Sequence, residues 1–121
     1  WEQYRITRRR CTERAFTGEY YDFKEKGIYK CVCCGEALFS SQSKYDSGTG
    51  WPSFCRPVSK CKIDIFVDES LGARSTEVKC VKCDAHLGHV FSDGPAPGNL
   101  RYSINSAALE FAAESSLALS V

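Results

Sequence analysis

The stretch CVKCDAHLGHVFSDGPAPGNLRYSIN, residues 80–105, combines three kinds of chemistry. It begins with two cysteines in C-x-x-C spacing, Cys80 and Cys83, which form half of a candidate metal site. Both histidines of the protein, His86 and His89, follow within it. It ends in a strand-like run, LRYSIN. We expect the rest of the chain to support these groups.

A second cysteine turn, CVCC at residues 31–34, completes the candidate metal site. Two such turns at strand ends that face each other form a tetrahedral four-sulfur cage, which in structural sites usually holds zinc. The predicted ligands are Cys31, Cys34, Cys80 and Cys83. Iron in the same cage, two disulfides, or a redox-active pair are the alternatives. Because four thiolates leave no open coordination position, the predicted role is structural.

The eight cysteines also bear on the compartment. Four of them fall into two C-x-x-C pairs, a spacing typical of metal ligands in a reducing environment rather than of a secreted disulfide scaffold. We therefore expect an intracellular protein, in the cytoplasm or in an organelle such as a plastid or mitochondrion. Cys33, between the two ligands of its turn, is expected to point away from them and to act as a small apolar packing residue.

Runs of β-branched and aromatic residues between turn residues predict a mostly β domain that comprises all 121 residues. Strands are expected over 28–33, 37–40, 63–67, 76–81, 87–91, 100–104 and 107–111. A short helix is expected within residues 1–10. The Gly- and Pro-containing segment 45–54 is expected to be irregular, segment 68–75 to be a polar connection, and residues 112–121 to be a loose tail.

Alternation along two of these strands predicts a shared polar face. Residues two apart in a strand point the same way, so Arg101, Ser103 and Asn105 share one face of the last-but-one strand. His89, Phe91 and Asp93 share a face by the same rule, and a bend near Gly88 would allow His86 to join them. Two imidazoles, a carboxylate, a guanidinium and an amide beside Ser103 form the inventory of an active site.

Several motifs together resemble the type B methionine sulfoxide reductases. YKCVCC followed by LF (29–39), YDSGTGWPSF (45–54), CDAHLGHVFSDGP (83–95) and LRYSINSAALEF (100–111) occur in the order and spacing of that family. TERAFTGEY (12–20) is similar to its N-terminal loop, particularly that of plant-type members. The resemblance covers residues 4–111. It implies a β-tent-like fold of two antiparallel sheets with short N-terminal helices and a structural zinc site, and reduction of the R epimer of methionine sulfoxide, free or in proteins.

One position departs from the family pattern. The family's nucleophile is the cysteine of an R-[YF]-C-x-N motif, and this chain has Ser103 there. A thiolate attacks the sulfoxide sulfur and retains the oxygen as a sulfenic acid. A serine hydroxyl is a much poorer nucleophile toward sulfur and does not enter thiol–disulfide exchange. We therefore expect this chain to be inactive, through an engineered Cys→Ser change; a naturally inactive, sulfoxide-binding homologue is the alternative.

The resemblance assigns further roles by position. Trp51 would hold the ε-methyl group of the substrate, and Phe91 would extend this apolar wall. His86 and His89 would hydrogen-bond the sulfoxide oxygen, directly or through water, and help to protonate it. Arg101 would lower the pKa of the nucleophile through its positive charge. Asp93 and Asn105 would orient the hydrogen-bond network.

The resolving cysteine, which would attack the sulfenic acid, is less well defined. Many family members carry it in the GTG loop, where this chain has Thr49. Cys11 matches an alternative position in the N-terminal loop and is our first choice, ahead of Cys61 and Cys55. Thioredoxin or a similar reductant would then reduce the disulfide.

Charge and hydropathy limit the other partners. With 16 basic and 15 acidic residues the net charge is +1, and no apolar run approaches the about 18 residues of a membrane span. We expect a monomer that binds neither nucleic acid nor membrane. The alternative function is a zinc-ribbon-like binding module for nucleic acid or protein. Such modules usually carry a basic or aromatic surface stripe, which this composition does not favour.

Overall fold

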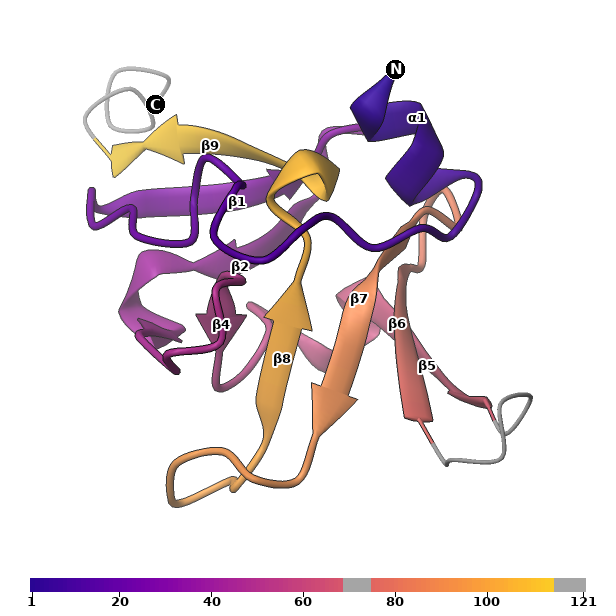
Figure 1. Ribbon diagram of the computed structural model, residues 1–121. Helices are drawn as coiled ribbons and strands as arrows, with labels where there is room; N and C mark the ends of the chain where they lie inside the picture. The colour runs from indigo at the N-terminus through magenta and orange to yellow at the C-terminus, as the bar shows by residue number, and fades with distance from the viewer. Residues whose placement is uncertain (69–74, 115–121) are drawn as a thin grey trace.

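The computed structural model describes residues 1–68 and 75–114, which form two antiparallel β-sheets and a short α-helix (Figure 1). The predicted mostly β fold is therefore confirmed. The smaller sheet has the strand order β2–β1–β9, and the larger has the order β3–β4–β8–β7–β6–β5. Within the described residues, no helix is long and apolar enough to cross a membrane.

The elements have the following bounds. The smaller sheet contains β1 (Gly27–Cys31), β2 (Ala37–Ser40) and β9 (Leu109–Ala113). The larger sheet contains β3 (Lys44–Tyr45), β4 (Ser53–Phe54), β5 (Ile63–Asp68), β6 (Ser75–Cys80), β7 (His86–Phe91) and β8 (Arg101–Ile104). The helical elements are α1 (Glu2–Thr7) and the 3-10 turns η1 (Ser41–Ser43), η2 (Lys60–Lys62) and η3 (Ser106–Ala108).

Two predicted strands, 28–33 and 76–81, end earlier than expected because the cysteine turns begin there. The N–H of Gly35 donates to the carbonyl of Cys31 at 2.8 Å, and the N–H of Asp84 donates to that of Cys80 at 2.8 Å. Gly35 has φ +79° and Asp84 has φ +65°, so each turn closes through one residue in the left-handed region. The strands therefore end at the first cysteine of each turn.

The C-terminal boundary also differs. The range 107–111 was predicted as the last strand, but Ser106–Ala108 forms η3 and the strand is Leu109–Ala113. Residues 112 and 113 pair with β1, at Ile28 and Gly27, so the predicted loose tail is wrong for those two positions. Residues 115–121 of that tail lie outside the described residues.

Other predicted segments are confirmed with small changes. The segment 45–54 is irregular except at its ends, where β3 and β4 pair as two-residue strands. The strand predicted at 100–104 begins one residue later, at Arg101. The ends of the predicted connection 68–75 belong instead to β5 and β6, and its residues 69–74 lie outside the described residues. The helix expected within residues 1–10 is α1.

An aromatic core joins the two sheets. Tyr29 of β1 and Phe39 of β2 pack against Phe54 of β4, with ring centroids 5.1 and 4.5 Å away. Phe39 also contacts Tyr102 of β8 at 5.8 Å. Each such pair contributes about 0.5–1.5 kcal/mol beyond its area burial. Because Tyr102 points into this core, its neighbour Ser103 points to the opposite face of β8.

The pairing of β7 with β8 places the polar groups of the two strands side by side. His89 lies opposite Ser103, Phe91 opposite Arg101, and Gly88 opposite Ile104. A Cβ at Gly88 would lie 2.0 Å from the backbone oxygen of Ser103. Only glycine therefore allows β7 to approach β8 this closely beside Ser103.

Candidate active site

Ser103 lies in a cavity of about 290 Å³, where side chains from four segments meet. The cavity is lined by Thr12, Thr49, Trp51, Gly88, His89, Phe91, Arg101, Ser103 and Asn105. Six of the predicted site residues are therefore brought together: the nucleophile position, one histidine, the arginine, the asparagine and the two aromatic residues. A volume at the lower limit of typical ligand pockets suits one amino-acid side chain rather than a large ligand.

A larger hollow of about 660 Å³ lies elsewhere, between α1 and η3. Charged side chains such as Glu2, Arg5 and Glu19 contribute to its lining, and it contains none of the predicted catalytic residues. Six of the predicted site residues instead line the smaller cavity.

The backbone of Glu13 holds two walls of the Ser103 cavity in place. The indole N–H of Trp51 donates to the Glu13 carbonyl at 2.9 Å. The Glu13 N–H donates to Oδ1 of Asn105 at 3.0 Å, and Nδ2 of Asn105 donates to the Leu87 carbonyl at 3.1 Å. The buried amide of Asn105 thus attaches the N-terminal segment to the sheet. In Figure 1 this segment crosses the ends of β7 and β8 after it leaves α1.

The side chain of Glu13 strengthens this attachment. It is 4% exposed, and its Oε1 accepts the N–H of Ala107 at 3.0 Å. Glu13 was not among the predicted site residues. A single glutamate in a loop has no periodicity or spacing that would distinguish it, so only its fit inside the TERAFTGEY segment could have drawn attention to it.

Arg101 is held by Asp93, at the outer side of the cavity. Nε of Arg101 donates to Oδ1 of Asp93 at 2.8 Å, and Nη2 donates to Oδ2 at 3.2 Å. The guanidinium also lies over the ring of Phe91, 4.4 Å from its centroid. The hydrogen bond from Arg101 lowers the pKa of Asp93, which is itself largely exposed. Asp93 was predicted to orient the histidines. In the structure it instead binds Arg101, which lines the cavity.

His86 is brought to the face of His89 by a β-bulge, as the predicted bend requires. Lys79 lies opposite His86 and Val78 opposite Gly88, so Leu87 is the extra residue on β7. The two imidazole rings lie 5.5 Å apart, nearly perpendicular at 71°. His86 is only 2% exposed and does not line the cavity, so it stands behind His89.

A buried carboxylate that was not predicted contacts His86. Oε2 of Glu77, on β6, lies 2.6 Å from Nδ1 of His86, and Glu77 is 3% exposed. Burial lowers the pKa of His86, and the hydrogen bond and charge of Glu77 oppose this shift. Glu77 lies opposite His89 in the sheet, so register pairing with the histidine strand is the signal that could have identified it.

The three candidate resolving cysteines differ in burial and in whether a sequence neighbour lines the cavity. Cys11 is partly buried and directly precedes Thr12, which lines the cavity. Cys55 follows β4 and is partly buried, and Cys61 is exposed in η2. Thr49 lines the cavity and its hydroxyl contacts that of Ser47 at 2.8 Å. The cysteine next to the cavity lining is therefore Cys11.

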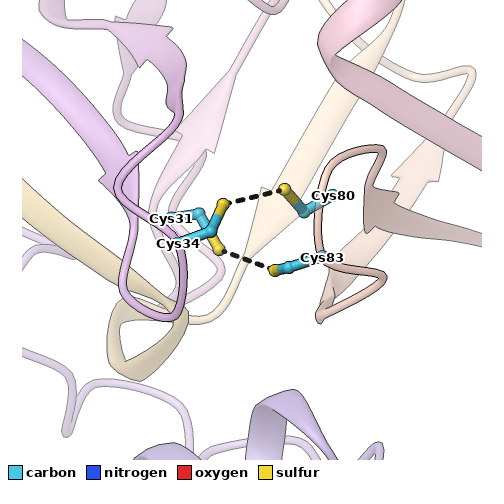
Figure 2. A group of neighbouring side chains, drawn as sticks. All are labelled: Cys31, Cys34, Cys80 and Cys83. Carbon is cyan, nitrogen blue, oxygen red and sulfur yellow. Dashed lines mark hydrogen bonds between the residues drawn. The ribbon is translucent and has the colours of Figure 1, made fainter.

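The four predicted metal ligands form one cluster (Figure 2). Their sulfur atoms all lie within 4.8 Å of one another, with Cys31 3.5 Å from Cys83 and Cys34 3.6 Å from Cys80. Four sulfurs bonded to a central zinc at about 2.3 Å are about 3.8 Å apart, so the cluster fits a tetrahedral metal. It joins the β1–β2 hairpin to the β6–β7 hairpin.

Burial disfavours the ionised form of two thiols of the cluster, those of Cys31 and Cys80. Burial raises the pKa of Cys31, and it raises the pKa of Cys80 to about 11. These thiols therefore resist ionisation unless a positive charge compensates. At the rim of the cluster, Arg8 donates to the Cys83 carbonyl at 2.8 Å. Cys33 was predicted to pack inside, which is wrong: it is exposed, because the turn projects the residue between its ligands into solvent.

Comparison with known proteins gives one consistent result. The model of the SelR domain family matches residues 1–113. The peptide methionine sulfoxide reductase MsrB of Hahella chejuensis is 63% identical over 110 residues, which are 91% of this chain and 79% of that protein. The MsrB proteins of Synechococcus sp. RCC307 and Acinetobacter baylyi are 56% and 58% identical, over 91% and 90% of this chain and 81% and 78% of theirs.

A solved structure extends the likeness at the level of the fold alone. The crystal structure of the Mis18 'Yippee-like' domain has a TM-score of 0.57 and 14% identity. The match covers 73% of this chain and 96% of that one. At this identity it carries no information about activity.

Proposed function

This chain belongs to the SelR domain family, and the relatives described above are peptide methionine sulfoxide reductases of the MsrB type. We propose that its fold supports the same type of reaction. The activity is thiol-dependent reduction of the R epimer of methionine sulfoxide, free or in proteins, by a cysteine at position 103. The observation that carries the proposal is the position of Ser103, in a cavity bounded by Trp51 and directly opposite His89.

The proposed reaction transfers one oxygen atom from the substrate sulfur to the enzyme sulfur. The thiolate at position 103 attacks the sulfoxide sulfur, and a donor in the cavity supplies a proton to the sulfoxide oxygen. The bond formed between the two sulfurs and the S–O bond of the substrate then break, the hydroxyl is transferred to the enzyme sulfur as a sulfenic acid, and methionine leaves with a reduced sulfur. His89 is the histidine that lines the cavity, so it is the proposed donor, with His86 acting behind it.

The remaining cavity residues have separate roles in this proposal. Trp51 and Phe91 form the apolar surface against the ε-methyl group, which selects the epimer. Arg101 supplies positive charge that favours a thiolate at position 103. Asn105 fixes the shape of the cavity through its bonds to Glu13 and Leu87.

With Ser103 the chain is proposed to bind sulfoxide without turning it over. The test compares this chain with its Ser103→Cys variant on R and S methionine sulfoxides, with dithiothreitol as reductant. We expect activity from the cysteine variant on the R epimer alone, and binding without turnover by the serine form in calorimetry. No activity from a folded Ser103→Cys variant would contradict the proposed reaction.

We also propose that the four-cysteine cluster holds zinc. Cys31, Cys34, Cys80 and Cys83 would bind it with their thiolates, and the ion would supply a fixed link between the two hairpins. Metal analysis of freshly purified protein should give one equivalent of zinc. Less than about half an equivalent of any metal would contradict a stoichiometric site.

The recycling step is proposed to use Cys11. The sulfenic acid condenses with the Cys11 thiol to form a disulfide and water, and thioredoxin reduces that disulfide. What supports Cys11 is its place beside Thr12 in the cavity wall. In the Ser103→Cys background, Cys11→Ser should abolish thioredoxin-supported turnover and retain turnover with dithiothreitol. Unchanged recycling would transfer the role to Cys61 or Cys55. We further propose a monomer that works in a reducing intracellular compartment.

A further inference from the structure

Behind the cavity wall lies a group of polar and charged side chains, of which the proposed reaction uses only His86. It consists of Arg10 in the N-terminal segment, Glu77 on β6 and His86 on β7. Nη2 of Arg10 donates to Oε1 of Glu77 at 3.0 Å, and Nε donates to Oε2 at 3.0 Å. The same Oε2 lies 2.6 Å from Nδ1 of His86. One buried carboxylate therefore joins the N-terminal segment to the histidine.

The geometry determines which nitrogen of His86 carries the proton. A carboxylate that receives two donors from a guanidinium acts as an acceptor toward its third neighbour. Nδ1 of His86 must then be the donor, so a neutral His86 has its hydrogen on Nδ1. Its Nε2 is left with a lone pair, and this atom is buried without a hydrogen-bond partner among the described residues.

The imidazole ring next to His86 is that of His89, which lines the cavity. His89 lies 5.5 Å from His86, centroid to centroid, and it lines the cavity beside Ser103. The register of the sheet places Ser103, His89 and Glu77 in one row across β8, β7 and β6. A buried acceptor behind a proton-donating histidine holds that histidine in one orientation, directly or through one water molecule.

We propose that Glu77 is a positioning residue that holds His86 in its Nδ1–H tautomer, so that Nε2 of His86 orients His89 toward the substrate oxygen. Arg10 completes the arrangement because its bidentate contact fixes the Glu77 carboxylate. The proposal rests on the proposed function for its catalytic meaning, but the tautomer is a property of the chain as it stands.

Nuclear magnetic resonance of the two imidazoles tests the tautomer without any activity. In ¹⁵N-labelled protein with Ser103, His86 should appear at pH 7.5 as a neutral ring protonated at Nδ1. The variant His89→Gln assigns the signals, since one histidine then remains. A neutral His86 protonated at Nε2 would overturn the proposal, whatever the outcome of the activity assays.

Two substitutions then move the titration of His86 in opposite directions. The charged and titratable groups that face His86 are Glu77 and Lys79 on β6, Arg10, and His89 on its own strand. Glu77 raises the pKa of His86 and Arg10 lowers it. Glu77→Gln should therefore lower the pKa of His86, and Arg10→Gln should raise it. Movement in the same direction, or none, would contradict the assigned contacts.

The activity readout uses the Ser103→Cys background. Glu77→Gln should lower kcat on the order of tenfold or more while KM changes little, because proton donation rather than binding is impaired. Glu110→Gln is the matched control, since Glu110 is exposed on β9, and it should leave kcat unchanged. If Glu77→Gln fails to fold, Arg10→Gln remains, because the side chain of Arg10 is 54% exposed; its pH–kcat profile should shift upward.

An unchanged kcat and pH profile in these variants would contradict the positioning role. Inactivity of the parent Ser103→Cys form would instead contradict the proposed function, and the tautomer measurement would still decide the place of Glu77.

Discussion

The cysteine cluster and the Ser103 cavity differ in how much of the chain each requires. Each cysteine turn is continuous in sequence and closes through its own backbone, with matching hydrogen bonds from Gly35 to Cys31 and from Asp84 to Cys80. The cavity takes residues from the N-terminal segment, the 45–54 segment, β7 and β8. Its Glu13–Asn105 bond joins positions 92 residues apart. The cluster should therefore tolerate local change poorly, and the cavity should respond to changes far away in the sequence.

The largest expected effect comes from the cluster. Cys80→Ser removes a buried ligand of the proposed zinc, and because metal binding energy in such sites is folding energy, we expect a loss of several kcal/mol and a fall in Tm of about 10 °C or more. Cys33→Ser is the matched control from the same turns, since Cys33 is exposed. Thermal unfolding with metal analysis measures both. Equal Tm values for the two variants would contradict a structural metal site that uses Cys80 and not Cys33.

The next effect concerns the approach of β7 to β8. Gly88→Ala places a Cβ 2.0 Å from the Ser103 backbone oxygen. The strands must separate, at a cost of about 1–3 kcal/mol or more, and activity in the Ser103→Cys background should fall with it. Gly98→Ala is the control, because nothing lies within 4 Å of a Cβ there. Urea unfolding compares the two, and a neutral Gly88→Ala would show that the strands adapt.

Replacing Glu13, far from Ser103 in the sequence, should lower the free energy of unfolding nearly as much. Glu13→Ala leaves the partly buried N–H of Ala107 without its acceptor, and we expect a loss of about 1–3 kcal/mol together with weaker anchoring of Trp51. Glu19→Ala, in the same segment but exposed, should change stability by less than about 0.5 kcal/mol. Denaturant unfolding followed by tryptophan fluorescence reports both quantities. Similar results for the two glutamates would mean that the N-terminal segment does not support the cavity.

The smallest effect is expected for Asp93, which pairs with Arg101 at the outer side of the Ser103 cavity. Asp93→Asn removes the charge that pairs with Arg101, but Asp93 is largely exposed, so Tm should not change measurably. In the Ser103→Cys background, kcat/KM should fall about threefold or less, since exposed ion pairs contribute little. Steady-state kinetics measures this. A much larger loss would show that Asp93 acts on the histidines themselves.

The same difference explains what could be predicted from the sequence. The ligands of the cluster follow from C-x-x-C spacing, and the shared face of Arg101, Ser103 and Asn105 follows from strand alternation. Glu77 and Glu13 were missed because their contacts depend on register and on a loop docking far along the chain. The burial of His86 depends on the bulge at Leu87, which places it behind His89 instead of beside it.

The Glu13–Asn105 contact also has a consequence for the order of events during synthesis. Asn105, which receives the N-terminal segment, is among the last residues of the described chain to be made, and Tyr20 likewise awaits Phe111, 91 residues later. Domains form as the chain leaves the ribosome, and contacts between distant positions form slowly. Arg8 and Arg10 can contact Cys83 and Glu77 earlier, but Glu13 remains undocked on the nascent chain until residue 105 has emerged and the cavity can close.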